Sequence, residues 1–452
     1  MSKWLKYISF VLIGLILMVI VCLKPVDRTP YQEMDFYQKM AQRIDSLNQT
    51  SMLRPSSDTL LIGWARVNIT PEQSMPLAGY GGRNPKAFES VKDSIYTRAI
   101  VFHDGVHKAA YVAVDLLIVH PEITQILTRK LAEFDWDIQQ VFLTATHSHS
   151  SIGGWAPGLV GNLLSGEFQK EIPAQIAESI TQSIVKAEQK LAVGYVSFNE
   201  LQATELVKNR LVKDQGQIDP WLKLFGIMSG DQRGYLTTFS AHATCLSRHT
   251  HWLSGDFPGR YTALLEQDST IDFAAYAAGA VGSMGPRTID VENEYLEVTD
   301  YSQKLSEYVA LLQRLAPEYT ADVNVDIWRI PLELRAPEYK ILKNISLRPW
   351  LFRKLFGDYH SELSILQIGK TIFLGLPGDF SGELALPLYE SAQKRGLNLV
   401  INSFNGGYIG YIIKDQWYDL NKYEARTMSW YGPDNGAYIS EVIRRIIVGI
   451  TI

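Results

Sequence analysis

The sequence is poor in cysteine and lacks clustered positive charge. Among its 452 residues only Cys22 and Cys245 carry thiols, and Cys22 falls in an apolar N-terminal run. The folded region therefore has no pair of cysteines for an internal disulfide bond. Cys245 has two open interpretations, a small buried thiol, which is the commoner case, and a reactive nucleophile. Because lysine and arginine form no basic run and the formal charge is −5, the composition excludes a nucleic-acid-binding surface.

Internal repeats and low-complexity tracts are also missing. The hydrophobic fraction of 46% and the aromatic fraction of 11% can fill a substantial core, which excludes disorder for most of the chain. The length suits one large domain or two ordinary ones. Because no change in composition divides the chain, we expect a single domain over residues 59–452.

The N-terminus carries the longest apolar run. Residues 7–23 are apolar or weakly polar, with Lys3 and Lys6 before them and Lys24 after them. This length reaches the lower limit for a helix that spans a bilayer. A cleaved signal peptide is the alternative, but the run ends without the small residues of a cleavage site. We expect an uncleaved anchor over residues 1–24 with its N-terminus inside, which places the body outside the cytoplasm, in a bacterial periplasm or at the cell surface.

The remaining chain alternates between short apolar runs and longer amphipathic ones. Residues 25–58 resemble a stalk, with helical spacing over 31–47 and a polar, turn-rich end. The strands that we expect are 99–102, 109–119, 141–146, 235–240, 273–277, 364–368, 372–376 and 399–402. The helices that we expect are 121–134, 168–191, 259–267, 295–315, 382–395 and 437–448. Gly369-Lys370 predicts a tight hairpin. The alternation predicts an α/β domain with a mixed sheet and flanking helices.

Two histidines follow one of these strands directly. The strand 141–146 runs into His147-Ser148-His149 and then into a small, glycine-rich loop. On an extended backbone, residues two apart project from the same face, so both imidazoles can converge. Ligand sites of α/β proteins gather at the carboxyl ends of strands, and neutral imidazole is a common zinc ligand. A pair of polar loop histidines is the alternative.

Further histidines follow a second strand. His242 comes directly after strand 235–240, and His249 and His251 form a rival pair a few residues later. Five of the nine histidines thus fall in two short segments, which favours a metal site. The place of His242 favours it as the ligand, although spacing alone does not decide.

Oxygen-bearing side chains follow two more strands. Asp379 lies between strand 372–376 and helix 382–395, where it is either a ligand or a helix cap. Tyr408 and Tyr411 follow strand 399–402, and Tyr423 comes soon after. From the residues alone, we interpret these tyrosines as packing residues.

The chain resembles the neutral, non-lysosomal ceramidases from about residue 60 to about residue 440. The matching segments, in the order of that family, are 63–70, 77–81, 97–101, 112–115, 146–154, 209–210, 242, 254–256, 377–380, 408–411 and 423–425. The resemblance implies a metallohydrolase fold and one zinc ion per chain, held by His147, His242, Asp379 and Tyr411. It also implies that His149, Arg210 and Tyr423 line the reacting centre. The implied reaction is hydrolysis of the N-acyl bond of ceramide or a related lipid amine by a zinc-activated water.

Three features depart from the family. The acidic ligand is typically glutamate there, whereas Asp379 is one methylene shorter. The family's Gly-Asp-Val-Ser-Pro-Asn segment reads 279–286 here, so Ser283 is either a substrate contact or an ordinary loop serine. We also expect no counterpart of the family's C-terminal β-sandwich.

Other functions stay open at this point. The zinc site would equally serve hydrolysis of a peptide, an acylated sugar or an ester. The same scaffold would also serve a non-catalytic envelope binding protein, for which the altered segment around Ser283 is the only support. A second ion, calcium or magnesium, is a further possibility that some relatives suggest, and the sequence predicts no oligomeric state.

Overall fold

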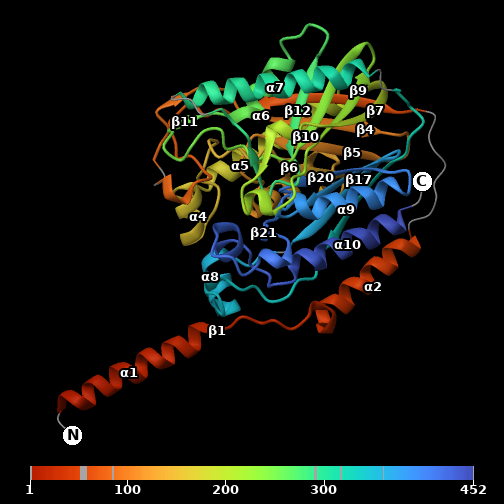
Figure 1. Ribbon diagram of the computed structural model, residues 1–452. Coiled ribbons are helices and arrows are strands. Elements are labelled where there is room, and N and C mark those ends of the chain that lie inside the picture. Colours follow the sequence, from red (N-terminus) through yellow and green to blue (C-terminus); the bar gives the residue numbers. More distant parts are fainter. Residues whose placement is uncertain are drawn as a thin grey trace.

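The computed structural model describes residues 3–50, 59–83, 86–289, 293–315, 318–359 and 361–450. Within these residues the body has four layers, with helices outside two stacked sheets (Figure 1). The helix α1 (Lys3–Cys22) projects from the body. The turn-rich end of the expected stalk, residues 51–58, lies outside the described residues.

The larger sheet has eight strands and mixed pairing. Its order is β12-β10-β9-β7-β2-β4-β5-β6. The pairs β10–β12 and β5–β6 are parallel, and the other pairs are antiparallel. In sequence order the strands are β2 (Leu61–Asn68), β4 (Tyr96–His103), β5 (Lys108–Val114), β6 (Val141–Ala145), β7 (Ala192–Gln202), β9 (Trp221–Ser229), β10 (Gln232–Phe239) and β12 (Phe273–Ala278). The expected mixed sheet is thus confirmed.

The smaller sheet has the order β14-β17-β18-β20. Its strands are β14 (Val325–Pro331), β17 (Glu362–Ile368), β18 (Thr371–Leu376) and β20 (Asn398–Ser403). The expected hairpin joins β17 to β18, where Ile368 pairs with Thr371 across Gly369-Lys370. Gly369 adopts a φ of 55°, a left-handed conformation that glycine enters without steric cost.

Alternating side chains build the core on both faces of each sheet. On β4, Ile100 and Phe102 pack between the two sheets, whereas Ala99 and Val101 face the outer helices. This period of two is what a strand buried on both faces requires. The outer faces are covered by α3 (Pro121–Leu131), α5 (Glu171–Glu188), α6 (Asp256–Leu265) and α7 (Glu294–Arg314) on the larger sheet, and by α9 (Gly382–Gln393) and α10 (Asn435–Gly449) on the smaller one.

Shorter elements complete the body and shape its site. The helices are α4 (Gly158–Ser165) and α8 (Pro349–Phe356), and Tyr423–Thr427 forms a π-helical turn. The short strands are β1 (Leu23–Pro25), β3 (Ser90–Val91), β8 (Val207–Asn209), β11 (Trp252–Leu253), β13 (Met284–Pro286), β15 (Lys340–Leu342), β16 (Ile345–Leu347), β19 (Asp379–Phe380) and β21 (Tyr411–Ile412). Every strand and helix expected from the sequence is present, although the strand expected over 109–119 ends at Val114.

The described part of the expected stalk packs on the body. The helix α2 (Asp35–Thr50) lies against α10, and its Met40 and Ile44 are buried in the same cluster as Ile443. Tyr37 donates a hydrogen bond to Glu441 of α10 at 2.7 Å. Residues 25–50 therefore belong to the packed body rather than to a free spacer.

Replacing Ile44 tests this packing. In the detergent-solubilised full chain, Ile44→Ala should lower the free energy of unfolding by about 2–5 kcal/mol, because it removes a buried side chain and leaves a cavity. Gln38→Ala, at an exposed position of the same helix, is the control and should leave stability nearly unchanged. Equal stability of the two variants, measured by chemical unfolding, would show that α2 does not belong to the cooperative fold.

Candidate active site

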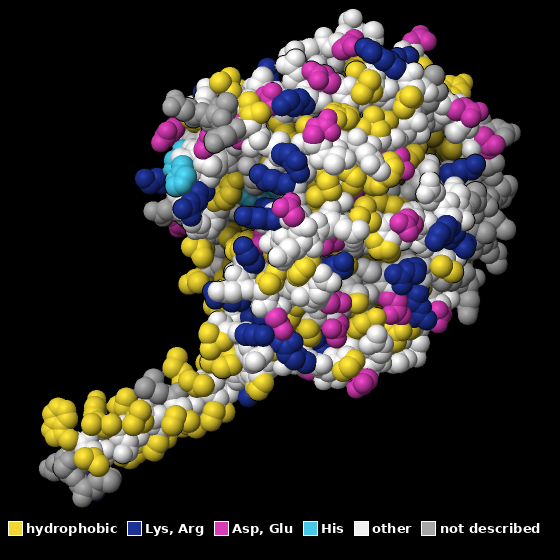
Figure 2. Space-filling view, viewed as in Figure 1, with side chains coloured by type: hydrophobic (Ala, Val, Ile, Leu, Met, Phe, Trp, Pro, Cys, Tyr) yellow, Lys and Arg dark blue, Asp and Glu magenta, His cyan; other side chains and the backbone are white. Residues whose placement is uncertain are grey.

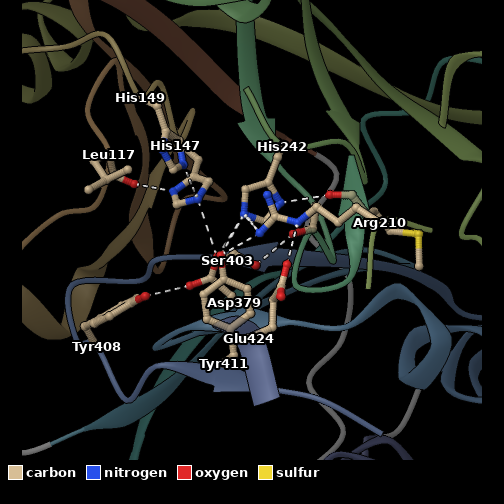
Figure 3. A network of polar contacts seen from close by, with 12 residues as sticks. Leu117, His147, His149, Arg210, His242, Asp379, Ser403, Tyr408, Tyr411 and Glu424 are labelled. Carbon is tan, nitrogen blue, oxygen red and sulfur yellow. Dashed lines mark hydrogen bonds and ion pairs between the residues drawn. The ribbon is translucent and has the colours of Figure 1, made fainter. Parts of the chain in front are cut away.

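The two edges of the larger sheet approach each other. The edge strands β6 and β12 contact one another, and both contact β20 of the smaller sheet. The loops that follow β6, β10, β18 and β20 therefore meet, and they bring the expected site residues together (Figure 3). Gathering at strand ends is the usual way in which an α/β protein builds a site.

His147 lies just beyond β6 in a strained backbone conformation. Its φ is 63°, which non-glycine residues adopt mainly where surrounding structure enforces it. Its Nδ1 donates to the carbonyl oxygen of Leu117 at 2.7 Å, and its ring stacks on Phe404 with centroids 4.1 Å apart. Because Nδ1 carries the proton, the lone pair of Nε2 faces the centre of the site.

His242 follows β10 and is oriented in the same manner. Its Nδ1 lies 2.9 Å from the carbonyl oxygen of Met284, so Nε2 again presents a lone pair. Nε2 lies 3.0 Å from Arg210 Nη2 and 3.1 Å from the hydroxyl oxygen of Tyr411. The side chain is fully buried. Both histidines thus have the tautomer in which Nε2 can bind a cation.

Asp379 and Tyr411 face each other across two parallel strands. They are register partners in β19 and β21. Asp379 Oδ2 accepts a hydrogen bond from Tyr408 at 2.8 Å, and the Tyr411 hydroxyl accepts one from Arg210 at 2.7 Å. The helix-cap interpretation of Asp379 is wrong, because Ser381 caps α9 by accepting from the amide of Glu383.

The carboxylate atom Oδ1 of Asp379 has no hydrogen-bond donor among the described residues and is buried. It lies 3.4 Å from His147 Nε2 and 3.3 Å from His242 Nε2. Three acceptor atoms at such distances repel one another unless positive charge lies between them. The donor set of imidazole nitrogen and carboxylate oxygen is the kind that binds zinc, so the residues fit a metal ion.

Burial keeps the imidazoles neutral. It lowers the pKa of His147 to about 3 and lowers the pKa of His149 and His242 well below the ordinary value. Burial likewise raises the pKa of Asp379 and Tyr411. A cation among these groups would favour the ionised forms of both oxygen ligands.

His149, Arg210 and Tyr423 lie around this cluster. His149 Nε2 is 3.1 Å from His147 Nε2, and the three histidines can present ligand atoms within 4.8 Å of one another. Arg210 also pairs with Glu424 at 3.2 Å. The ring of Tyr423 lies 6.1 Å from that of Tyr411. The geometry thus admits His149 either as a ligand or as a neighbour of the ion.

Ser283 and the rival histidines lie elsewhere. The Ser283 hydroxyl contacts the hydroxyl of Ser381 at 2.5 Å, while its carbonyl accepts from the amide of Arg210. His249 and His251 line a separate surface depression with Glu294. Cys245 is buried, and burial raises the pKa of its thiol well above the ordinary value, as the structural interpretation of this cysteine requires.

An apolar pocket of about 580 Å³ leads to the cluster. Its polar end includes His147, His149, Arg210 and Tyr411. Most other lining side chains are aliphatic or aromatic: Leu117, Ile118, Trp155, Val160, Leu163, Leu164, Phe356, Met428 and Trp430. Sites with a few polar groups at one end of an apolar cavity suit a ligand that is itself mostly apolar.

Several groups that hold the site carry little or no signal in the sequence. The carbonyls of Leu117 and Met284 orient the histidines, and no sequence pattern marks a backbone carbonyl. Tyr408 was interpreted as a packing residue and Glu424 lies within a segment that resembles the family, yet they contact Asp379 and Arg210 respectively. A carboxylate or a hydroxyl within such a segment is the only signal that could have identified them.

Comparison with known proteins agrees with the geometry. A family model described as "Neutral/alkaline non-lysosomal ceramidase, N-terminal" matches residues 60–294. The chain is 26% identical over 241 residues to the neutral ceramidase of Mycobacterium tuberculosis and 24% identical over 245 residues to that of Pseudomonas aeruginosa. These alignments cover 49% and 50% of this chain but only 37% and 36% of the relatives.

The fold is shared with a solved structure. The crystal structure of neutral ceramidase from Pseudomonas aeruginosa superposes with a TM-score of 0.74 at 18% identity, covering 87% of this chain and 74% of that one. A structure described as "Ceramidase complexed with C2" gives a TM-score of 0.75 at the same identity, covering 86% and 75% of the two chains. Because the family model covers residues 60–294, more than half of the chain, the protein belongs to the neutral/alkaline non-lysosomal ceramidase family.

Proposed function

We propose that the protein is a zinc-dependent amidohydrolase that cleaves the N-acyl bond of ceramide or a related acylated lipid amine. The observation that carries this proposal is the convergence of His147, His242 and Asp379, with facing acceptor atoms, at the polar end of an apolar pocket. Membership of the ceramidase family supports an amide as the bond that is cleaved.

The proposed ion site uses four side chains. His147 and His242 contribute Nε2, Asp379 contributes Oδ1 and Tyr411 contributes its hydroxyl oxygen. A zinc ion bound there would act as a Lewis acid and would lower the pKa of water toward about 7. Nitrogen and oxygen donors at a buried site favour zinc over calcium or magnesium, which prefer oxygen ligands.

The surrounding residues supply proton transfer and charge stabilisation. His149 lies beside the ligand His147, where it can relay a proton from the attacking water to the amine nitrogen as that nitrogen leaves. Because burial lowers the pKa of His149, its imidazole would hold the extra proton only transiently. The pKa of Tyr423 is raised to about 12 by partial burial, so its hydroxyl keeps the proton and can donate to the developing oxyanion. Arg210 holds Tyr411 in place and faces the pocket. We assign no substrate contact to Ser283.

The pocket favours a lipid over the alternative substrates. Its walls are aliphatic and aromatic, whereas a peptide or an acylated sugar would need polar partners along the groove. A non-catalytic binding protein would have no need for facing acceptor atoms. A fatty-acid ester is the second candidate, because the same pocket accommodates its acyl chain.

The proposed location is the outer face of a membrane. Trp4–Cys22 is long and apolar enough to cross a bilayer, with a mean hydropathy of 2.6 and no buried part. Lys6, near the N-terminal end of this helix, favours a cytoplasmic N-terminus. Residues 59–452 then form the extracytoplasmic catalytic domain, next to its lipid-like substrate.

Metal analysis tests the ligand set. The purified full chain should contain about one zinc ion, as a single catalytic site requires, and His147→Ala and His242→Ala should lose it because each removes a nitrogen ligand. His249→Ala is the control and should keep the ion. His149→Ala should also keep it, whereas loss of zinc in that variant would show that His149 is a ligand. Zinc bound normally by His147→Ala and His242→Ala would contradict the site.

Substitution of the proposed oxyanion donor tests the mechanism. Tyr423→Phe removes one hydroxyl group and should lower kcat by about 10²–10³-fold, as loss of a single oxyanion donor does in other enzymes. Zinc content should stay the same, since Tyr423 is not a proposed ligand. Tyr418→Phe is the matched control, because Tyr418 does not line the pocket. An unchanged kcat in Tyr423→Phe would remove this residue from the mechanism.

Product analysis tests the substrate class. The zinc-loaded full chain should release fatty acid and sphingoid base from ceramide, and a chelator should abolish the release until zinc is restored. Parallel assays use a fatty-acid ester, an N-acylated sugar and a peptide. Turnover of one of these without turnover of ceramide would move the assignment to that substrate. Zinc binding without hydrolysis of any of them would favour a binding protein.

A further inference from the structure

The helix α1 joins the body through a fixed connection. The carbonyl oxygens of its last residues, Ile20, Val21 and Cys22, accept hydrogen bonds from Arg348 Nε, Trp350 Nε1 and the Arg348 amide at 2.9, 3.1 and 2.8 Å. These carbonyls have no partner within a helix that ends at Cys22. The start of α8 therefore caps the end of α1.

The residues after α1 extend this connection. The strand β1 begins at Leu23 without any spacer and pairs with β16 in antiparallel register. Lys24 pairs at 2.5 Å with Glu338, whose side chain is only 1% exposed. Arg335 donates to the carbonyls of Asp27 and Thr29 at 3.3 and 2.9 Å. These contacts fix the orientation of the body relative to α1.

Exposed apolar side chains surround this junction. We name this group the exit surface, and it comprises Leu159 and Leu163 on α4, Ile341, Leu342 and Ile345 on β15 and β16, and Trp350 on α8. Leu159 is 71% exposed, and Leu342 is 58% exposed. Helix α4 contacts α8. Figure 2 shows hydrophobic side chains continuing from α1 onto the adjoining flank of the body, with lysine and arginine side chains beside them.

The composition of α4 is unusual for an exposed helix. Its sequence, Gly-Leu-Val-Gly-Asn-Leu-Leu-Ser, has no charged residue. An exposed helix normally presents charged or polar side chains to water, and an apolar patch of this kind marks a contact surface. The apolar composition of the exit surface is therefore typical of a surface in contact with another molecule or a membrane, whereas no described residue covers Leu159.

The mouth of the pocket is built by the same elements. Val160, Gly161, Leu163 and Leu164 of α4 line the pocket, as does Phe356 of α8. Leu163, which is 55% exposed, belongs both to the exit surface and to the lining of the pocket, so the exit surface reaches the pocket opening. Whatever covers the exit surface also meets the pocket mouth.

We propose that the exit surface rests on the bilayer that α1 crosses, so that the pocket receives its lipid amide directly from the membrane. This inference deepens the proposed function and rests on it. The position of the exit surface beside α1 favours a bilayer as the partner that covers it, because a membrane-spanning α1 would bring lipid next to the junction. Trp350 of α8 contacts the end of α1, and tryptophan is enriched at membrane interfaces. Lys343 and Lys354 flank the apolar residues, where ammonium groups can meet lipid phosphates.

Lipid quenching tests the contact. Cysteines are introduced one at a time at Leu159, Leu342 and Leu311 of the full chain, in a Cys22→Ser background whose remaining thiol, Cys245, is buried, and they are labelled with an environment-sensitive fluorophore. Leu311, half exposed on α7 across the body from α1, is the matched control. In nanodiscs of phosphatidylcholine and phosphatidylglycerol, a lipid spin-labelled near the headgroup should quench the labels at 159 and 342 but not at 311.

A label at Leu12, near the middle of α1, is read with a lipid spin-labelled within its acyl chain, and it tests separately whether α1 lies in the bilayer. Quenching at 12 without quenching at 159 and 342 would overturn the exit surface while keeping the anchor. No quenching at 12 would overturn both, since α1 would not lie in lipid. Shielding of 159 from water without quenching by lipid would show a protein occupant and would also overturn the proposal. None of these readings requires turnover, so they stand even if ceramide is not the substrate.

Activity provides a second measurement. Leu159→Glu and Leu342→Glu place charges on the exit surface, and neither residue lines the pocket. Turnover of a lipid substrate embedded in vesicles should fall about tenfold, as burying a charge at a bilayer surface would cause. Turnover of a short-chain soluble analogue should not change, and Leu311→Glu should affect neither. Equal rates on vesicles for all three variants would overturn the proposal.

Discussion

The structure depends on one electrostatic constraint, the placement of facing acceptor atoms on buried side chains. Asp379 Oδ1 lies 3.4 Å from His147 Nε2 and 3.3 Å from His242 Nε2, and all three side chains are buried. Tyr408 donates to Oδ2 of Asp379, but Oδ1 has no donor among the described residues, and burying a charge without a full set of partners costs several kcal/mol. No packing advantage explains such an arrangement, so the rest of the site is best understood as a support for positive charge at this point.

Backbone groups, more than side chains, hold these acceptor atoms in position. Carbonyls of Leu117 and Met284 fix the tautomers of two histidines, and the parallel pairing of β19 with β21 sets Asp379 opposite Tyr411. These positions in turn require the two edges of the larger sheet to come together. The placement of the site atoms therefore depends both on the curvature of the larger sheet and on the strained backbone of His147, whose φ is 63°.

Sequence reasoning recovered the parts of this arrangement that have a local pattern. His147 and His242 follow apolar strands directly, and strand ends are where sites form. Strands β7 and β9 were missed because glycine, lysine and other polar residues interrupt their apolar pattern. The curvature that joins β6 to β12 has no local signature. Helix α2 was interpreted as part of a stalk, since its partner α10 lies some 400 residues away, as the separation of Tyr37 and Glu441 illustrates. Only the family resemblance, and not spacing, distinguished Tyr411 from a packing residue.

The lining of the pocket and the fixed connection to α1 both suit a substrate that enters the pocket from the membrane. His147, His149, Arg210 and Tyr411 line the pocket together with mostly aliphatic and aromatic side chains, so the proposed orientation of an acylated amine places its amide at the cluster and its alkyl chains along the apolar side chains. Such a molecule loses little hydrophobic free energy if it passes from lipid into the pocket without entering water, because each exposed methylene would cost about 0.8 kcal/mol. A flexible stalk would leave the pocket mouth free to face the solvent. The capped end of α1 and the strand that follows it hold the mouth in one orientation, which makes the direct route geometrically available.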